Sequence, residues 1–415
     1  KKSIKRIDGI TAKSISSGQV ITSLSNVVKE LIENSIDAKS THICLKFKDF
    51  GKESIECADN GFGVEESDFE SIAKRHYTSK LSDFSQLSTI QTFGFRGEAL
   101  SSLCDLSKVW IHSRHLSQSI GTKLYFNSEG IVIRRELSPR NIGTTVTVEN
   151  LFNSIPVRRK EFVNNIKREF DKMLRLVYSY CIGCVGIRIS CTNQLVNKTK
   201  QTIFCCPGIS IKNNIVQIFD SKQLNSLIEF EQHIESDEQS SNDNNGIKIT
   251  GFISKCDFGC GRSANDRQFL YVNRRPCELK NILKFINETY RNFNRNQYPF
   301  VLLNIEIDKS LVDFNVTPDK RQLIISKEEQ IFSIIKESLI KMYNKENSCQ
   351  LDSMTNYTTK LFHNLSQKRK SEPVDEEVKA IMSTPLKMSR CRSPCDSPFK
   401  ESVNNERLIV SPNVS

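Results

Sequence analysis

Apolar residues near the start of the chain recur at helical spacing. Between residues 16 and 38 they occupy positions 24, 27, 28, 31, 32 and 36. This pattern predicts one helix over residues 16–38. Two stretches of strand-like composition follow, residues 41–51 and 53–59, with Gly51 at the turn between them. They predict two strands that pair with each other.

The alternation of helical and strand-like stretches continues to about residue 194. Strands are predicted at residues 106–114, 121–127, 130–137, 143–152 and 185–193, and helices at 65–76 and 160–180. The second of these helices is basic and amphipathic. Helices interleaved with a largely antiparallel sheet predict an α/β sandwich.

The pattern restarts near residue 205. Helices are predicted at residues 211–220, 279–294 and 328–344, strands at 247–255, 267–275 and 299–308, and a polar loop at 235–246. After residue 345 the periodicity fails, and Ser, Asn, Pro and charged residues dominate. The expected organisation is therefore an α/β domain at 1–204, a second α/β domain at 205–344 and a disordered linker at 345–415.

Composition narrows the classes of protein only slightly. The 59 basic and 48 acidic residues give a net charge of +11, which favours contact with a polyanion such as nucleic acid without requiring one. No apolar stretch reaches the roughly 18 residues of a membrane span, so no membrane partner is expected. The 14 cysteines show no zinc-ribbon spacing, which favours free thiols in a reducing compartment. Because residue 1 is a lysine, we expect a fragment or a processed chain.

One face of the first predicted helix combines polar side chains with an apolar border. On a helical wheel, Asp37, Asn26 and Asn34 fall within roughly 40° of Glu30, and the apolar stripe begins just beyond Asn34. A carboxylate beside apolar walls is partly desolvated and is a better base toward a nearby water. An amide oxygen one turn away suits Mg²⁺, which takes few protein ligands. The alternative is an ordinary amphipathic helix with a solvated polar face.

Three later segments are rich in glycine, hydroxyl and cationic residues. "ADNGFGV" at residues 58–64 follows a predicted strand, "YTSK" occupies 77–80, and "FGFRGEAL" at 93–100 precedes a predicted helix start at Glu98. Bare backbone permits close approach of a flat ligand, and N–H groups at a helix start bind anions. Each segment alone is also typical of a simple loop. The sequence contains no Walker A motif and no kinase motif set.

Taken together, these segments resemble the MutL family of GHKL ATPases, whose members act in DNA mismatch repair. The resemblance lies in "VVKELIENSIDA", "DNGFGV", "HYTSK", "FGFRGEALSSL", "GTTVTVENLFNSIPVR" and "FNVTPDKRQ". "SSGQV", "SCTNQL", "GRSANDRQFLYVNRRPC" and "NQYPFVLLNI" resemble the eukaryotic PMS branch. The resemblance covers residues 5–344. It implies a GHKL (Bergerat) α/β sandwich ATPase domain, a ribosomal S5 domain-2-like transducer domain and a linker.

The resemblance also implies roles for individual residues. Glu30 matches the general base that activates water, and Asn34 matches the Mg²⁺ ligand. Asp59 matches the carboxylate that reads the adenine amino group, with Thr144 beside the same base. Lys320 matches the lysine that reaches the γ-phosphate from the second domain. Gly63 matches the close-approach glycine. The phosphate and lid contacts match Thr78, Ser79 and Lys80. The lid and the helix start over the phosphates match Gly94, Arg96, Gly97, Glu98, Ala99 and Leu100.

The implied function is that of a slow Mg²⁺-dependent ATPase head in a nuclear mismatch-repair protein. ATP would drive dimerisation with another MutL homologue, non-specific binding of double-stranded DNA and cooperation with a MutS-like mismatch-recognition complex. Arg158, Arg159, Lys160, Lys167 and Arg168 are candidates for the DNA surface, or form a solvated basic helix. The alternative function is an ATP-gated DNA clamp or switch with negligible hydrolysis.

Two departures from the family pattern bear on these expectations. Lys39 stands where the family commonly has Gly, so the end of the first helix requires a left-handed lysine. The family's C-terminal dimerisation and endonuclease domain does not appear in these 415 residues. We therefore expect no DNA nicking and no constitutive dimerisation.

Overall fold

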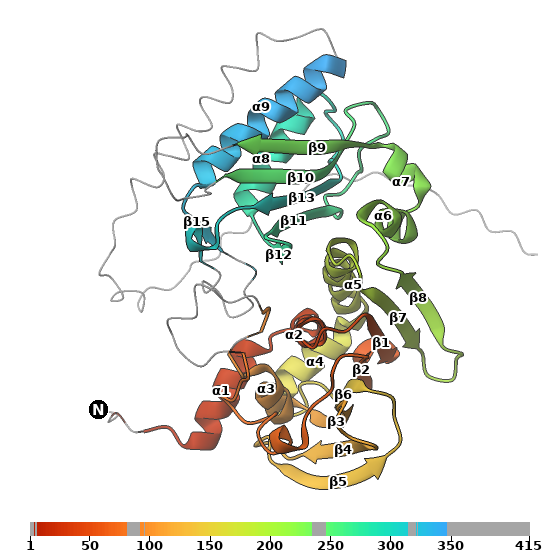
Figure 1. Cartoon of the computed structure of the whole chain (residues 1–415), viewed down its shortest axis with the longest axis vertical. Coiled ribbons are helices and arrows are strands. Elements are labelled where there is room, and N and C mark those ends of the chain that lie inside the picture. Colours follow the sequence, from red (N-terminus) through yellow and green to blue (C-terminus); the bar gives the residue numbers. More distant parts are fainter. Residues whose placement is uncertain are drawn as a thin grey trace, which may run out of the picture. The chain divides into compact units, whose positions relative to one another are not determined.

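The computed structural model describes residues 4, 6–80, 92–94, 96–234, 246–313, 321 and 323–346 (Figure 1). These residues all fall within one compact unit, residues 1–351. Within the described part of the unit there are two separate sheets, one of eight strands and one of five, and a two-stranded ribbon. The predicted linker at 345–415 lies almost wholly outside the described residues, as does most of the predicted loop at 235–246.

The first sheet has the strand order β5-β4-β3-β6-β2-β1-β7-β8. Neighbouring strands are antiparallel except for β1 and β7, which are parallel. This confirms the predicted, largely antiparallel α/β layer and adds β8, which the sequence pattern missed. The strands are β1 (His42–Lys48), β2 (Ser54–Asp59), β3 (Lys108–Arg114), β4 (Gly121–Phe126), β5 (Val132–Ser138), β6 (Gly143–Glu149), β7 (Arg188–Gln194) and β8 (Gln201–Cys206).

Helices pack beside this sheet, and three of the predicted helices differ from the structure. The helix predicted at residues 160–180 is two helices that meet at Asn165. The single helix predicted over residues 16–38 is two helices, because Ser23 adopts extended backbone and its hydroxyl accepts a hydrogen bond from the amide of Asn26 at 3.3 Å. The helix predicted at 65–76 contains only a short 3₁₀ turn, Glu66–Asp68. The helices are α1 (Gly9–Val20), α2 (Leu24–Asp37), α3 (Ala99–Leu106), α4 (Pro156–Asn164) and α5 (Ile166–Gly183).

The second sheet has the order β12-β11-β13-β10-β9. Its strands are β9 (Leu227–Ile234), β10 (Ile247–Ser254), β11 (Gln268–Val272), β12 (Arg275–Cys277) and β13 (Val301–Glu306), and the ribbon pairs β14 (Val312–Asp313) with β15 (Ile324–Ile325). The associated helices are α6 (Ile211–Phe219), α7 (Ser221–Asn225), α8 (Lys280–Arg291) and α9 (Glu328–Glu346). Strands β9 and β12 and helix α7 were not predicted.

Each sheet has its own apolar core. The first is built from strands β1–β4 and β6–β8 and helices α2–α5, and includes Leu31, Phe47 and Tyr180. A smaller cluster joins the end of α5 to α6 and the second sheet through Ile182, Phe219 and neighbouring rings. A domain boundary after residue 204 would fall within β8, so a division near this point stays a prediction. Among the described helices, none combines the length and apolarity that crossing a bilayer requires.

Candidate functional site

Helix α2 is the element around which the candidate site is built. Its apolar face, Leu24, Val27, Val28, Leu31 and Ile32, is buried against the first core. The helix ends at Asp37. Lys39 follows with a left-handed backbone conformation (φ 58°), which glycine adopts most easily. Lys39 therefore adopts the left-handed conformation that was expected at the end of this helix.

Glu30 lies at the border of the apolar face, as the helical wheel predicted. Its side chain is 14% exposed, and Oε1 lies 3.1 Å from the ammonium of Lys29. Lys29 itself is buried and also donates to Glu33 Oε2 at 2.8 Å, while the Tyr180 hydroxyl donates to Glu33 Oε1 at 2.7 Å. Burial acts to lower the pKa of Lys29, but attraction by Glu33 and Glu30 outweighs it and raises that pKa above 10.5. Glu30 is thus held beside an ammonium whose ionised form the two glutamates stabilise.

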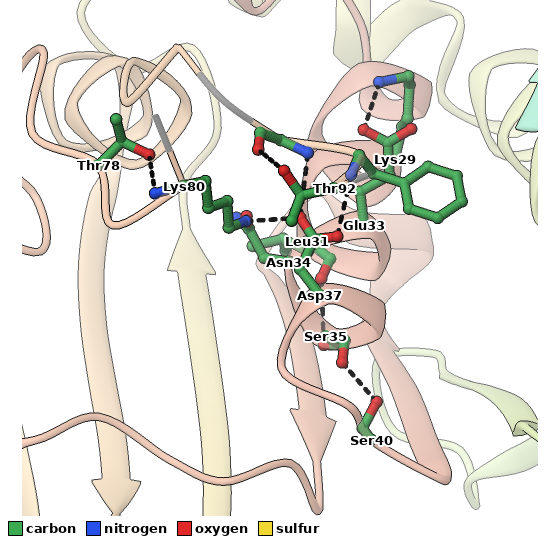
Figure 2. Close-up of polar contacts among 12 residues, drawn as sticks. Lys29, Leu31, Glu33, Asn34, Ser35, Asp37, Ser40, Thr78, Lys80 and Thr92 are labelled. Atoms are coloured by element: carbon green, nitrogen blue, oxygen red, sulfur yellow. Dashed lines mark hydrogen bonds and ion pairs between the residues drawn. The ribbon is translucent and has the colours of Figure 1, made fainter. Parts of the chain in front are cut away.

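Asn34 lies one turn further along α2, at the centre of a polar cluster (Figure 2). The ammonium of Lys80 donates to Asn34 Oδ1 at 3.0 Å and to Asp37 Oδ2 at 2.6 Å. The Asp37 carboxylate also accepts the amides of Phe93 at 2.9 Å and Gly94 at 3.0 Å. Asp37 lies on the polar face that the helical wheel predicts, although no sequence motif assigns it a role. It is the carboxylate that holds the "YTSK" and "FGFRG" segments against the helix.

Asp59 and Thr144 meet at the end of β2, as the sequence interpretation required. The amides of Gly61 and Thr144 donate to Asp59 Oδ1 at 2.9 and 3.1 Å, and the Ser35 hydroxyl donates to Oδ2 at 3.0 Å. Burial raises the pKa of Asp59 above 3.8, although these three hydrogen bonds and the charge of Arg140 oppose the shift. A carboxylate accepts about four hydrogen bonds, so Oδ2 retains capacity for one more donor.

The glycines of the site serve two different purposes. A Cβ at Gly63 would lie 2.1 Å from the carbonyl oxygen of Arg114, and one at Gly61 would lie 2.6 Å from that of Ala38. A Cβ at Gly97 would lie 2.4 Å from the Tyr77 carbonyl oxygen. These three therefore permit close packing within the chain, and the close approach of a ligand at Gly63 stays a prediction.

Gly94 is the glycine that faces the polar cluster. A Cβ there would lie 3.1 Å from Lys80 Nζ, 3.4 Å from Asn34 Oδ1 and 3.5 Å from Asp37 Oδ2. The residue is buried. A side chain at position 94 would therefore press on the atoms that the cluster brings together.

The remaining residues of the predicted lid lie in the segment at residues 77–80 and at the start of α3. The Thr78 hydroxyl accepts the amide of Lys80 at 3.1 Å, and Ser79 is exposed. Helix α3 begins at Ala99, followed by Leu100, and the side chain of the preceding Glu98 makes no capping hydrogen bond. Instead, Glu98 Oε1 lies 3.4 Å from Arg75 Nη2. Arg96 is half-buried. Lys320 lies outside the described residues, so its predicted reach to the site stays untested.

The basic residues of α4 and α5 separate into two groups. Arg158 donates to the carbonyls of Gly18 and Ile21, and Arg159 to those of Leu151 and Lys52, so both bind the chain itself. The exposed members of the predicted DNA surface are Lys160, Lys167 and Arg168.

The donor set around Asn34 suits a cation. Magnesium takes hard oxygen ligands, and two such oxygens, from Asn34 and Asp37, already converge on a positively charged group. Asp37 is nearly buried, with a side chain only 5% exposed, so its charge is little screened by water. The residues present therefore fit a divalent ion, provided that the Lys80 ammonium moves away from Asn34.

Comparisons with known proteins place the chain in a family. Residues 21–142 match the family described as histidine kinase-, DNA gyrase B- and HSP90-like ATPase, and residues 215–344 match the DNA mismatch repair protein C-terminal domain. The human mismatch repair endonuclease PMS2 is 49% identical over 354 residues, 83% of this chain and 41% of that protein. The DNA mismatch repair protein PMS1 of Saccharomyces cerevisiae is 40% identical over 357 residues, again 83% and 41%.

A solved structure extends the similarity to the fold. The crystal structure of the N-terminal domain of a DNA repair protein matches with a TM-score of 0.74 and 40% identity, over 81% of this chain and 99% of that one. The chain spans about two fifths of the length of the curated relatives it matches. By these matches to both segments and to the whole domain pair, the chain belongs to the MutL family of DNA mismatch-repair proteins, in its PMS branch, and contains the family's GHKL-type ATPase domain.

Proposed function

We propose that this chain binds ATP and hydrolyses it slowly in a Mg²⁺-dependent reaction, as the head of a mismatch-repair protein. One observation carries the proposal. Glu30 lies at the half-buried edge of α2, one turn from Asn34 and two turns from Asp37, whose oxygens converge on a cation. A base and a cation site on one helix face are what phosphoryl transfer to water needs.

The adenine end of the site is assigned to Asp59. Its Oδ2 accepts only the Ser35 hydroxyl among the described residues, so it can also accept an exocyclic amino group of a base. Thr144 lies beside the same carboxylate through its amide. The three donors from the chain hold the carboxylate in one orientation before any ligand arrives.

The phosphate end is assigned to the segments that Asp37 holds. Lys80 leaves Asn34 and turns its ammonium toward the phosphates, joined by Thr78, Ser79, Arg96 and the amides of residues 97–100 at the start of α3. Asn34 Oδ1 then becomes available as a magnesium ligand. The ion, when bound, neutralises charge on the phosphate oxygens. Lys320 is assigned the contact from the second domain.

Hydrolysis itself is assigned to Glu30. Its carboxylate accepts a proton from a water whose oxygen bonds to the γ-phosphorus, while the bond from that phosphorus to the β,γ-bridging oxygen breaks. The products are ADP and inorganic phosphate. Lys29 holds the carboxylate in place through Oε1 at 3.1 Å.

The wider role follows from the family. We assign to the chain dimerisation with another MutL homologue, non-specific binding to double-stranded DNA, work alongside a MutS-like complex and a nuclear location. The names of the relatives, mismatch repair proteins of animals and yeast, support this assignment. Exposed Lys160, Lys167 and Arg168 supply candidate phosphate contacts, and such binding weakens steeply with salt.

The test measures ATP binding and steady-state hydrolysis in parallel. Glu30→Gln should lower kcat by about 10²- to 10⁴-fold, because a positioned base is removed, while ATP affinity stays within about twofold. Glu66→Gln, an exposed carboxylate outside the site, is the matched control. If wild type binds ATP but hydrolyses none above the Glu30→Gln background, the chain is an ATP-gated switch and the hydrolytic assignment is wrong.

A further inference from the structure

An arginine of the second sheet contacts the segment beside the candidate nucleotide site. Arg275, the first residue of β12, donates from Nη2 to the carbonyl oxygens of Thr92 at 3.1 Å and Phe93 at 2.8 Å. Its guanidinium also lies over the Phe93 ring, 5.0 Å from the ring centre. An arginine from the second sheet thus hydrogen-bonds the backbone just before Gly94.

The same short segment also hydrogen-bonds to α2. Asp37 accepts the amides of Phe93 and Gly94, so Arg275 binds the carbonyls and Asp37 the N–H groups of consecutive peptides. Charged partners make these hydrogen bonds stronger than neutral ones. Residues 92–94 are therefore clamped between a cation of the second sheet and an anion of the first domain.

The clamp fixes the position of the site's polar cluster. The Cα of Gly94 faces Lys80 Nζ, Asn34 Oδ1 and Asp37 Oδ2, and even a methyl group there would contact all three. A shift of a few tenths of an ångström in this segment therefore changes the room available to Lys80. Since Lys80 competes with a metal for Asn34 Oδ1, the segment influences how readily that amide is released.

We propose that Arg275 is a positioning residue that couples the second sheet to the nucleotide site through residues 92–94. The path consists of direct contacts: Arg275, the Thr92–Gly94 backbone, Asp37, Lys80 and Asn34. The coupling rests on the proposed function, because it acts on the step in which Lys80 leaves Asn34. It gives the second sheet a route to the nucleotide that is separate from the predicted reach of Lys320.

The neighbouring arginine supplies a matched control. Arg274 has the same charge and lies one position earlier in the same turn, but its side chain is 82% exposed and its nearest acid, Glu306, is 4.0 Å away. Arg274→Ala removes an arginine from this turn without touching residues 92–94. Arg275→Lys keeps the charge but replaces the planar guanidinium with a shorter point charge.

The experiment combines kinetics with amide hydrogen exchange in the whole chain. In Arg275→Ala without nucleotide, exchange at the Phe93 and Gly94 amides should accelerate about tenfold, because the carbonyl side of the clamp is lost. The kcat for ATP should fall about tenfold while affinity for ADP stays within twofold, since Asp59 is untouched. Arg275→Lys should lie between wild type and Arg275→Ala, and Arg274→Ala should match wild type.

A coupling readout separates positioning from a purely structural role. Nucleotide should change exchange at the β12 amide of Cys277 in wild type but not in Arg275→Ala. If wild type hydrolyses ATP and Arg275→Ala keeps its kcat and its exchange rates, the coupling is wrong while the ATPase assignment stands. If wild type neither binds nor hydrolyses ATP, the proposed function fails and the coupling fails with it. Equal losses in Arg274→Ala and Arg275→Ala would also contradict the proposal.

Discussion

Helices α2 and α8 have similar lengths, 14 and 12 residues, and both present an apolar face to a core, but they bury different chemistry. Helix α8 buries Ile282, Phe285, Ile286, Thr289 and Tyr290, which are apolar or nearly so. Helix α2 buries five aliphatic residues and, with them, Lys29, Glu33 and Ser35. The side chains that α8 buries are uncharged, whereas the buried face of α2 carries the Lys29–Glu33 ion pair.

The difference lies in the cost of burying charge. Removing a lysine and a glutamate from water costs several kcal/mol, which their attraction offsets only with good geometry and further hydrogen bonds. Lys29 meets both conditions by bonding Glu33 and Glu30, and Tyr180 satisfies the far oxygen of Glu33. The charges of α2 hold Glu30 in place, whereas α8 has no comparable task.

The largest expected effect comes from removing the buried cation. Lys29→Met leaves Glu33 buried without its ammonium and should lower the free energy of unfolding by about 3–5 kcal/mol. Lys284→Met on α8, whose side chain is 64% exposed and pairs loosely with Glu288, should change it by less than about 0.5 kcal/mol. Urea denaturation with a common slope measures both.

A double variant sharpens the same comparison. Lys29→Met combined with Glu33→Met replaces both buried charges with apolar side chains and should recover most of the lost stability, because neither Lys29 nor Glu33 is left buried without its partner. Its kcat should stay low, since Glu30 has lost its positioning partner. Similar stability losses for Lys29→Met and Lys284→Met would contradict the account of α2.

The second effect compares two buried tyrosines. Tyr180→Phe removes a donor to the charged Glu33 and should cost about 1.5–3 kcal/mol, whereas Tyr290→Phe removes a donor to the Lys255 carbonyl oxygen and should cost about 1 kcal/mol. Thermal unfolding followed by circular dichroism ranks the two. A larger loss for Tyr290→Phe would show that α2 gains nothing special from its charges.

The smallest effect is a pH dependence of nucleotide binding. Because burial raises the pKa of Asp59 above 3.8, its carboxylate takes up a proton at a higher pH than an exposed aspartate does. Binding of adenine needs the ionised form, so affinity should be constant above the folded pKa and decline by up to about tenfold per pH unit below it. Titrations with ADP at several pH values check this. A decline that begins only below 3.8 would contradict the role of burial.

Much of the fold was predictable because period and turn residues are local properties. The strands of the first sheet, apart from β8, and the amphipathic helices α8 and α9 follow apolar spacing closely, whereas the helix predicted at 160–180 spans α5 and the end of α4. The break between α1 and α2 was missed because apolar positions continue through it and only Ser23 marks the new start. Strand β12 was missed because three residues carry too little pattern.

The site was predictable in outline but not in its supporting contacts. The helical wheel placed Glu30, Asn34 and Asp37 on one face, and the family resemblance linked them to Asp59. No single-helix pattern distinguishes a buried lysine from a solvated one, so Lys29 and its partner Glu33 were missed. Arg275 was missed because its partners lie about 180 residues away and are backbone atoms, which leave no trace in composition.

The central claim is that the polar end of α2 and Asp59 together form a nucleotide site. Calorimetric titration of the whole chain with ATP and Mg²⁺, for wild type, Asp59→Asn and the exposed control Asp68→Asn, tests it most directly. We expect saturable binding to wild type and Asp68→Asn and a loss of about ten- to hundredfold in Asp59→Asn, which replaces a carboxylate acceptor with an amide. Equal affinity in all three proteins, or no binding to wild type, would contradict the account.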